Sequence, residues 1–200
     1  KNITMNKMNI LKYFSLSLFL AAAIVFTGCS KSDDGNDKVE VADYAKNIVG
    51  TWEMEGWSIS LADKKTSAKY NVEVKLDAIS GSKIYMNGME LDEKMLKGLG
   101  FKLSVDDFPV QRLQFDKDHK MTSYEYDGGW KAGDDKPTYD IKNGVLTIIS
   151  SDNISMKILS MERNSCIFDV PAFVEEMMKD YKLTEKFDVK SAKLKMKRLS

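Results

Sequence analysis

The chain is poor in the residues on which most catalytic and metal sites depend. It has two cysteines and one histidine among 200 residues. A zinc site of paired histidines or clustered cysteines has no basis in this composition, and neither does a framework of several disulfides. No glycine-rich phosphate loop, nucleophile elbow or paired-histidine motif occurs. The sequence therefore gives no reason to expect an enzyme, and it predicts no cofactor and no metal.

An excess of charge of either sign is also missing. Lysine plus arginine and aspartate plus glutamate number 30 each. Proteins that bind nucleic acid rely on an excess of positive charge facing the phosphates, so a nucleic-acid partner is not expected. The lone His119 follows Asp116 and Asp118 in an expected turn, where a solvated surface role is the usual one. The alternate carboxylates lack the glycine and the distal glutamate of a calcium loop.

The longest apolar run lies near the start of the chain. It extends from Tyr13 to Phe26 behind Lys7 and Lys12, and a polar segment follows Cys29. This is the layout of a secretory signal, and the run is too short to span a bilayer comfortably, which needs ~20 apolar residues. Phe26-Thr27-Gly28-Cys29 resembles the lipobox of bacterial lipoproteins. The resemblance implies cleavage after residue 28 and a lipid-modified Cys29.

The same resemblance implies a place in the cell envelope. Fatty acyl chains such as palmitate on Cys29 would hold the protein at a membrane, since two chains suffice for stable anchoring. Ser30 after the cysteine favours the outer membrane by analogy with lipoprotein sorting. Residues 31–34 are similar to acidic surface-export signals of Bacteroidota-type lipoproteins, or form a plain solvated tether. Periplasmic and cell-surface orientations both stay open.

Three regions are predicted: a signal peptide over residues 1–28, a lipidated tether over 29–46, and one folded domain over 47–200. Removing the first leaves about 170 residues, close to the commonest single-domain size. In the domain, short β-rich segments recur between turn signals, which is typical of an all-β barrel or sandwich. The expected strands are Gly50–Leu61, Tyr70–Leu76, Gln111–Phe115, Lys120–Tyr126, Thr138–Ile141, Val145–Ser150, Ile154–Met161, Cys166–Val170 and Phe187–Leu199.

Two segments have helical rather than strand periodicity. Met89–Gly100 repeats apolar residues at helical spacing and ends in glycine, as many helices do. Pro171–Tyr181 starts with proline, which a first helical turn tolerates. Both are expected to be short accessory helices, and Val41–Asn47 is a further candidate for a short helix at the entrance to the domain. Cys166, in an expected strand, is interpreted as a small core residue.

Gly50-Thr51-Trp52 opens the first expected strand and resembles the Gly-x-Trp signature of lipocalins. In that family the tryptophan closes one end of an antiparallel β-barrel beneath an arginine from the last strand, and Arg198 stands near the end of the last strand here. The resemblance thus implies a lipocalin-like barrel closed by Trp52 and Arg198. The helical insertion between residues 80 and 109 and the lack of disulfides favour the lipocalin-like domains of bacterial surface lipoproteins.

A barrel of about eight strands has room for a small ligand. Four aromatic residues are the candidates to line its pocket, although each of them also suits an ordinary core: Trp57, Tyr124, Tyr126 and Trp130. Trp57 and Trp52 share a face only if a bulge, for which Gly56 is suited, lies between them. The expected function is binding of a small apolar molecule; the alternative is a structural module that docks another envelope protein. A cavity above roughly 300 Å³ distinguishes the first.

Overall fold

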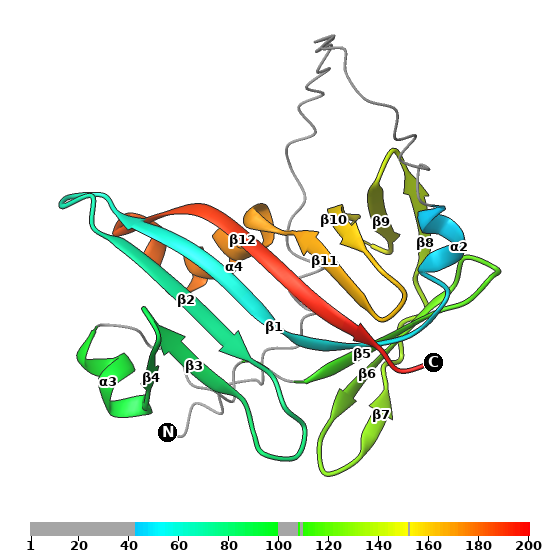
Figure 1. Cartoon of the computed structure of the whole chain (residues 1–200), viewed down its shortest axis with the longest axis horizontal. Coiled ribbons are helices and arrows are strands. Elements are labelled where there is room, and N and C mark those ends of the chain that lie inside the picture. Colours follow the sequence, from blue (N-terminus) through cyan, green and yellow to red (C-terminus); the bar gives the residue numbers. More distant parts are fainter. Residues whose placement is uncertain (1–42, 100–107, 109, 152) are drawn as a thin grey trace, which may run out of the picture.

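The computed structural model describes residues 43–99, 108, 110–151 and 153–200 (Figure 1). The signal peptide, Cys29 and most of the tether therefore lie outside the described residues. The helices are α2 (Tyr44–Asn47), α3 (Glu93–Gly98) and α4 (Pro171–Asp180), with a 3-10 turn, η2 (Leu183–Glu185). The strands are β1 (Gly50–Asp63), β2 (Lys69–Lys75), β3 (Lys83–Met86), β4 (Met89–Leu91), β5 (Gln111–Phe115), β6 (Met121–Tyr126), β7 (Trp130–Ala132), β8 (Thr138–Lys142), β9 (Val145–Ile149), β10 (Ile154–Met161), β11 (Ser165–Asp169) and β12 (Phe187–Arg198).

All strands belong to one antiparallel sheet in which β1 and β12 are the two long central members (Figure 1). The main path runs β4-β3-β2-β1-β12-β11-β10-β9-β8. The start of β1 also pairs with β5, which continues to β6 and β7. One bridge, between Lys120 and Thr138, joins the β6 and β8 ends of these two branches. A mainly β, antiparallel fold is confirmed, whereas the ladders do not close the sheet, so a barrel is not shown.

The long strand β1 contains a bulge that keeps its apolar side chains on one face. Met54 pairs with Met196 and Trp57 with Leu194, and the register shifts between Met54 and Gly56. Leu194 and Met196 are two residues apart on β12, so they share a face. The shift therefore places Trp57 on the same face as Met54. Gly56 has φ +154°, and a Cβ there would lie 2.0 Å from the Val74 carbonyl oxygen. Only glycine fits this position, and the bulge for which Gly56 is suited is present between Trp52 and Trp57.

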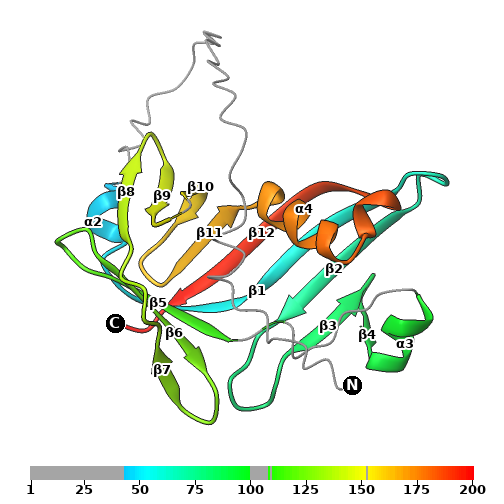
Figure 2. The same cartoon turned by 180° about the vertical axis from the view of Figure 1, so that it is seen from behind.

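The inner face of the sheet carries the hydrophobic core, and α4 covers part of it (Figure 2). Val174, Met177 and Met178 are buried where α4 meets the sheet. Phe173 of the same helix stacks on Trp57, with ring centres 5.3 Å apart. No helix among the described residues is long and apolar enough to cross a membrane. The helix predicted over Pro171–Tyr181 is present as α4, and its buried side chains pack on the core.

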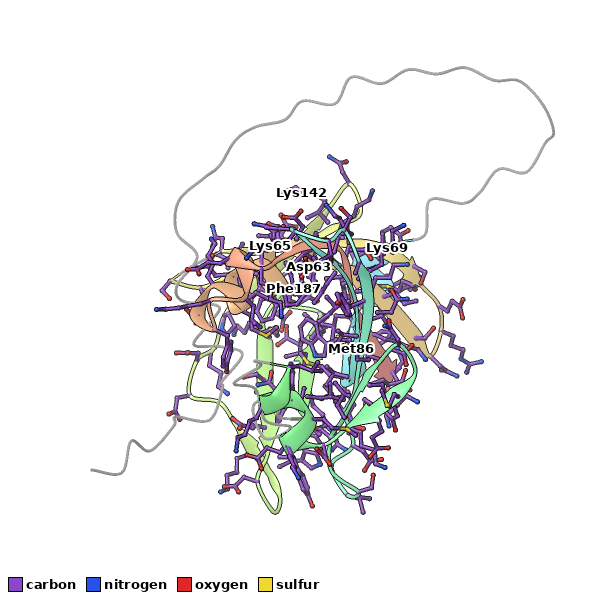
Figure 3. The ribbon with its side chains drawn as sticks, turned by 90° about the vertical axis from the view of Figure 1, so that its left-hand side faces the viewer. Asp63, Lys65, Lys69, Met86, Lys142 and Phe187 are labelled. Carbon is purple, nitrogen blue, oxygen red and sulfur yellow. The ribbon has the colours of Figure 1, made fainter. Side chains whose placement is uncertain are left out.

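The prediction of one helix over Met89–Gly100 is only half right. Residues 89–91 form β4, and α3 begins after Asp92, whose carboxylate accepts a hydrogen bond from the Met95 backbone N–H at 2.7 Å. Asn87 and Gly88 both have positive φ, as the tight turn of the β3–β4 hairpin requires. This Asn-Gly dipeptide is the local sequence signal for the hairpin, and β7 is a further strand outside the predicted set. Figure 3 views the molecule from this side, with Met86 of β3 labelled and Asp63 and Lys69 at the β1–β2 turn.

Candidate functional site: a polar cleft beside the bridge between β6 and β8

A wide cleft opens beside the point where β6 meets the start of β8. The bridge at Lys120 and Thr138 is followed by a hydrogen bond from the Met121 N–H to the Pro137 carbonyl, 2.9 Å long. The Gly133 N–H also donates to the Ser123 carbonyl at 2.8 Å, so the segment 133–137 runs beside β6, and the cleft next to it has a volume of about 890 Å³. Its walls come from β5, β6 and β7, from the segment 133–137 that leads into β8, and from residues 149–151 at the end of β9.

Two buried polar side chains form the floor of the cleft. Gln111 of β5 is 2% exposed and Ser123 of β6 is 3% exposed, and both line the cleft. No side-chain hydrogen bond joins either residue to another described residue, and Arg198 Nε is the one fully buried side-chain N or O atom without a partner among them, so the polar atoms of Gln111 and Ser123 remain open to the cleft. Buried amides and hydroxyls are normally hydrogen-bonded, because leaving them unpaired costs about 1–3 kcal/mol. The floor therefore offers donors and acceptors to a water molecule or a ligand in the cleft.

The inner face of β5 and β6 changes from apolar to polar towards this cleft. Phe115 lies opposite Met121, Leu113 opposite Ser123, and Gln111 opposite Glu125. Alternate residues on a strand share a face, so these three pairs stand in a row on one side of the two strands. The first pair belongs to the core and the last to the cleft. One strand pair thus connects packed interior to polar site.

The rim of the cleft carries more negative than positive charge. Its carboxylates are Glu125, Asp127, Asp134 and Asp135, and its cations are Lys131 and Lys136. Lys131 donates a hydrogen bond to the Asp127 carboxylate at 2.8 Å, and this bond raises the pKa of Lys131. Three carboxylates and one lysine are left outside that pair, so the cleft presents a negative field to solvent.

Three of the four aromatic residues predicted to line a pocket gather on the opposite, outward face of β6 and β7. Tyr126 pairs with Trp130, and their ring centres are 5.3 Å apart in an edge-to-face arrangement. The Arg112 guanidinium lies 3.7 Å from the centre of the Trp130 ring. Tyr124 borders the cleft but donates its hydroxyl to Gln114, 2.8 Å away. These rings form a partly exposed surface group, and only Tyr124 reaches the cleft.

Arg112 is held by the buried carboxylate of Glu53 on β1. Glu53 accepts a hydrogen bond from the Arg112 Nε atom at 2.8 Å, forms an ion pair with its Nη2 atom at 2.8 Å, and lies 2.9 Å from Lys197 Nζ. Burial alone would raise the pKa of Glu53, but hydrogen bonds from Lys197 and Arg112 outweigh it and hold that pKa below its ordinary value. The cluster ties β12, β1 and β5 together and fixes the cation that covers Trp130.

The remaining predicted residues lie away from the cleft. Trp57 is buried beneath Phe173 of α4, so it belongs to the core. Trp52 is fully buried, and the Arg198 guanidinium lies 4.7 Å from the centre of its ring. The Trp52 indole N–H donates to the Ile48 carbonyl at 2.7 Å, and Arg198 donates to the Asn47 carbonyl. The contact that the lipocalin resemblance implies is present, while its role in closing a barrel stays a prediction.

An apolar cavity lies at the other end of the inner face, and it is small. It occupies about 40 Å³ between the sheet, α3, α4 and η2, and every residue around it is apolar. This volume is far below the ~300 Å³ of a typical ligand pocket. Apolar side chains fill the rest of the interior, including Trp52, Phe115, Phe168, Leu146 and Met196.

The other candidates for chemistry have structural roles. His119 has a positive φ in the turn before β6, and its Nδ1 atom lies 3.0 Å from the Tyr139 carbonyl oxygen. Cys166 is buried, and burial raises the pKa of its thiol to about 12. Within the described ranges, no group of three or more potential metal-ligating side chains occurs.

Comparison with protein-family models, with curated proteins and with solved structures found no match for this chain.

Sequence reasoning missed Gln111 and Ser123, and a signal for them was present. Both stand at inward positions of strands whose other inward residues are apolar, such as Leu113 and Met121. A polar residue at such a position is either paired in the core or faces a site. Such inward polar residues can be found from the inward and outward alternation of each strand alone. The aromatic residues, in contrast, were selected by type alone.

Proposed function

We propose that this protein is a non-catalytic binding module, tethered to the cell envelope through a lipid on Cys29, that takes a small polar ligand in the cleft between β6 and β8. One observation carries the proposal: Gln111 and Ser123 are almost completely buried, line a cleft of about 890 Å³, and have no hydrogen-bond partner among the described residues. The ligand differs from the apolar molecule expected from the sequence, because the apolar cavity holds only about 40 Å³.

The proposal includes a lipocalin-like barrel as the scaffold of the site. Its support is that β1 pairs on one side with β12 and on the other with β5, and that the bridge between Lys120 and Thr138 joins β6 to β8. Strands β1, β12, β11, β10, β9, β8, β6 and β5 would then form a ring. The cleft would be the mouth of that ring, beyond the single bridge.

Native mass spectrometry on the full chain, purified in a nonionic detergent and exposed to envelope extract, tests the ligand. We expect a polar small molecule to be retained by the wild type. Gln111→Met keeps the side-chain volume but removes the amide, and it should abolish retention. Thr122→Val removes a polar group from the outward face of β6, away from the cleft lining, and should leave retention intact. A ligand that partitions into the lipid extract and survives Gln111→Met would overturn the proposal.

A second candidate function rests on the outward rings. Tyr, Trp and Arg are the residue types enriched at binding hot spots between proteins, and Tyr126, Trp130 and Arg112 are in mutual contact on one surface. This group favours docking of another envelope protein. Cross-linking in intact cells distinguishes the two functions, since Trp130→Ala should abolish a cross-linked partner only if the rings form the interface.

A further inference from the structure

The charge around the cleft narrows the class of ligand, on the assumption that the cleft is the binding site proposed above. We infer that the ligand carries a positive charge as well as hydroxyl groups, as an amino sugar does. Glu125 lies directly opposite Gln111 in the β5–β6 ladder and on the same face, so a carboxylate stands beside the buried amide. Both residues line the cleft.

The rim carboxylates outnumber the cations that face them. Lys131 pairs with Asp127 at 2.8 Å and also stands opposite Glu125 in the β6–β7 ladder, so one lysine serves two carboxylates. Asp134 and Asp135 form no salt bridge within 4.0 Å to a described residue, and Lys136 directs its ammonium to the Gly133 carbonyl at 3.3 Å. An ammonium group on a ligand would supply the missing cation. An anionic ligand would meet like charge, which electrostatic complementarity excludes.

The floor and the rim then divide the recognition between them. The Gln111 amide has two donor hydrogens and an acceptor oxygen, and the Ser123 hydroxyl both donates and accepts, so together they suit the hydroxyl groups of a sugar. The carboxylate of Glu125 suits the amine. Buried hydrogen-bonding groups give specificity, because a ligand that lacks the matching groups leaves them unpaired.

A matched set of sugars tests the inference. Glucosamine, glucose and glucuronate have similar size and differ in charge at neutral pH. In NMR titrations of the full chain in nonionic detergent, the Gln111 side-chain amide signals report the site. We expect glucosamine to bind about three- to tenfold more tightly than glucose, as one or two partly exposed ion pairs provide. Glucuronate should bind least, and added salt should weaken the preference for glucosamine.

Two sets of variants locate the charge. Glu125→Gln should lower the affinity for glucosamine to that for glucose. If Glu125→Gln does not fold, the double variant Asp134→Asn with Asp135→Asn serves instead, and it should reduce the preference for glucosamine over glucose. Glu73→Gln, on β2 away from the cleft, is the control and should change nothing. If glucose and glucosamine shift the Gln111 signals at equal concentrations, the charge inference is wrong and the polar cleft stands. If no sugar shifts them, both proposals fail.

Discussion

The two ends of the inner sheet face are built on different strands of one sheet, β1 to β4 at one end and β5 to β9 at the other, and they have opposite polarity. Near α4, the residues around the cavity of about 40 Å³ are all apolar, Leu61 and Val74 among them. Beside the bridge between β6 and β8, Gln111, Ser123 and Glu125 take the equivalent inward positions around a cleft of about 890 Å³. Strand alternation alone does not separate a core from a site. The residue types at the inward positions do.

The exclusion of water from the interior should have its largest measurable effect on the alkylation rate of Cys166. Burial raises the pKa of its thiol to about 12, so little thiolate forms at pH 8. In a Cys29→Ser variant, we expect iodoacetamide to label native Cys166 about a thousandfold more slowly than the urea-unfolded chain. Both labelling rates are measured by mass spectrometry of samples quenched at successive times.

A cysteine in the cleft is the comparison. Glu125→Cys in a chain that also carries Cys29→Ser and Cys166→Ala should be labelled within about tenfold of its unfolded rate, because half-buried thiols in a wet cleft remain accessible. Rapid labelling of native Cys166 would show that β11 opens locally, and it would remove the contrast between the packed interior and the cleft.

Truncation of the dry end should cost the most stability. Leu61 is 4% exposed and lines the apolar cavity, so Leu61→Ala should lower the free energy of unfolding by about 2–5 kcal/mol. Urea denaturation followed by tryptophan fluorescence measures it. Leu159→Ala removes the same atoms from a residue that is 41% exposed, and it should stay within about 0.5 kcal/mol of the wild type. Equal losses would contradict the assignment of the core.

The ion pairs on the outward face should contribute an intermediate, pH-dependent amount. Glu53→Gln should cost about 1–3 kcal/mol at pH 7, the range for hydrogen bonds to charged groups. The folded pKa of Glu53 is lowered, so its contribution is present above the unfolded value near ~4.3 and is lost as the pH falls through the folded value. Urea midpoints of the wild type and Glu53→Gln should therefore converge in acid. A difference that persists at pH 2.5 would refute the linkage.

The polar floor should matter least for stability. Gln111→Leu replaces an amide without a described partner by an apolar side chain, and this change is expected to be nearly neutral, within about 1 kcal/mol in either direction. Urea denaturation of this variant sets the contrast with Leu61→Ala on one scale. A loss above about 2 kcal/mol would mean that Gln111 is a structural residue and not the floor of a site.

Much of the strand pattern follows from local sequence. Gln111–Phe115 and Ile154–Met161 are predicted to the residue, and Asn143 with Gly144 forms the expected tight turn with positive φ at both positions. Alternation and turn chemistry act over a few residues, so one strand at a time is enough. The β3–β4 hairpin was missed because the apolar spacing that runs on into α3 was given more weight than its own Asn-Gly turn.

The site was harder to predict because it depends on contacts distant in sequence. The cleft exists where Lys120 meets Thr138 and where residues 149–151 face β5 and β6. Periodicity assigns Gln111 to the inward face but not to an open end. The predicted aromatic residues show the converse. On β6, Tyr124 and Tyr126 lie on the face opposite to that of Ser123, so a site predicted from aromatic residue type alone falls on the outward face of the strand.

The bulge at Gly56 has a consequence for how this sequence tolerates change. It resets the alternation of β1 by one residue, so that Trp52 and Leu61 both point inward although nine positions separate them. Deleting a single residue at this point would exchange the two faces for everything beyond it and turn the apolar end inside out. A loss of one codon here would do more damage than the removal of any one core side chain, because the whole hydrophobic pattern of β1 depends on that one offset.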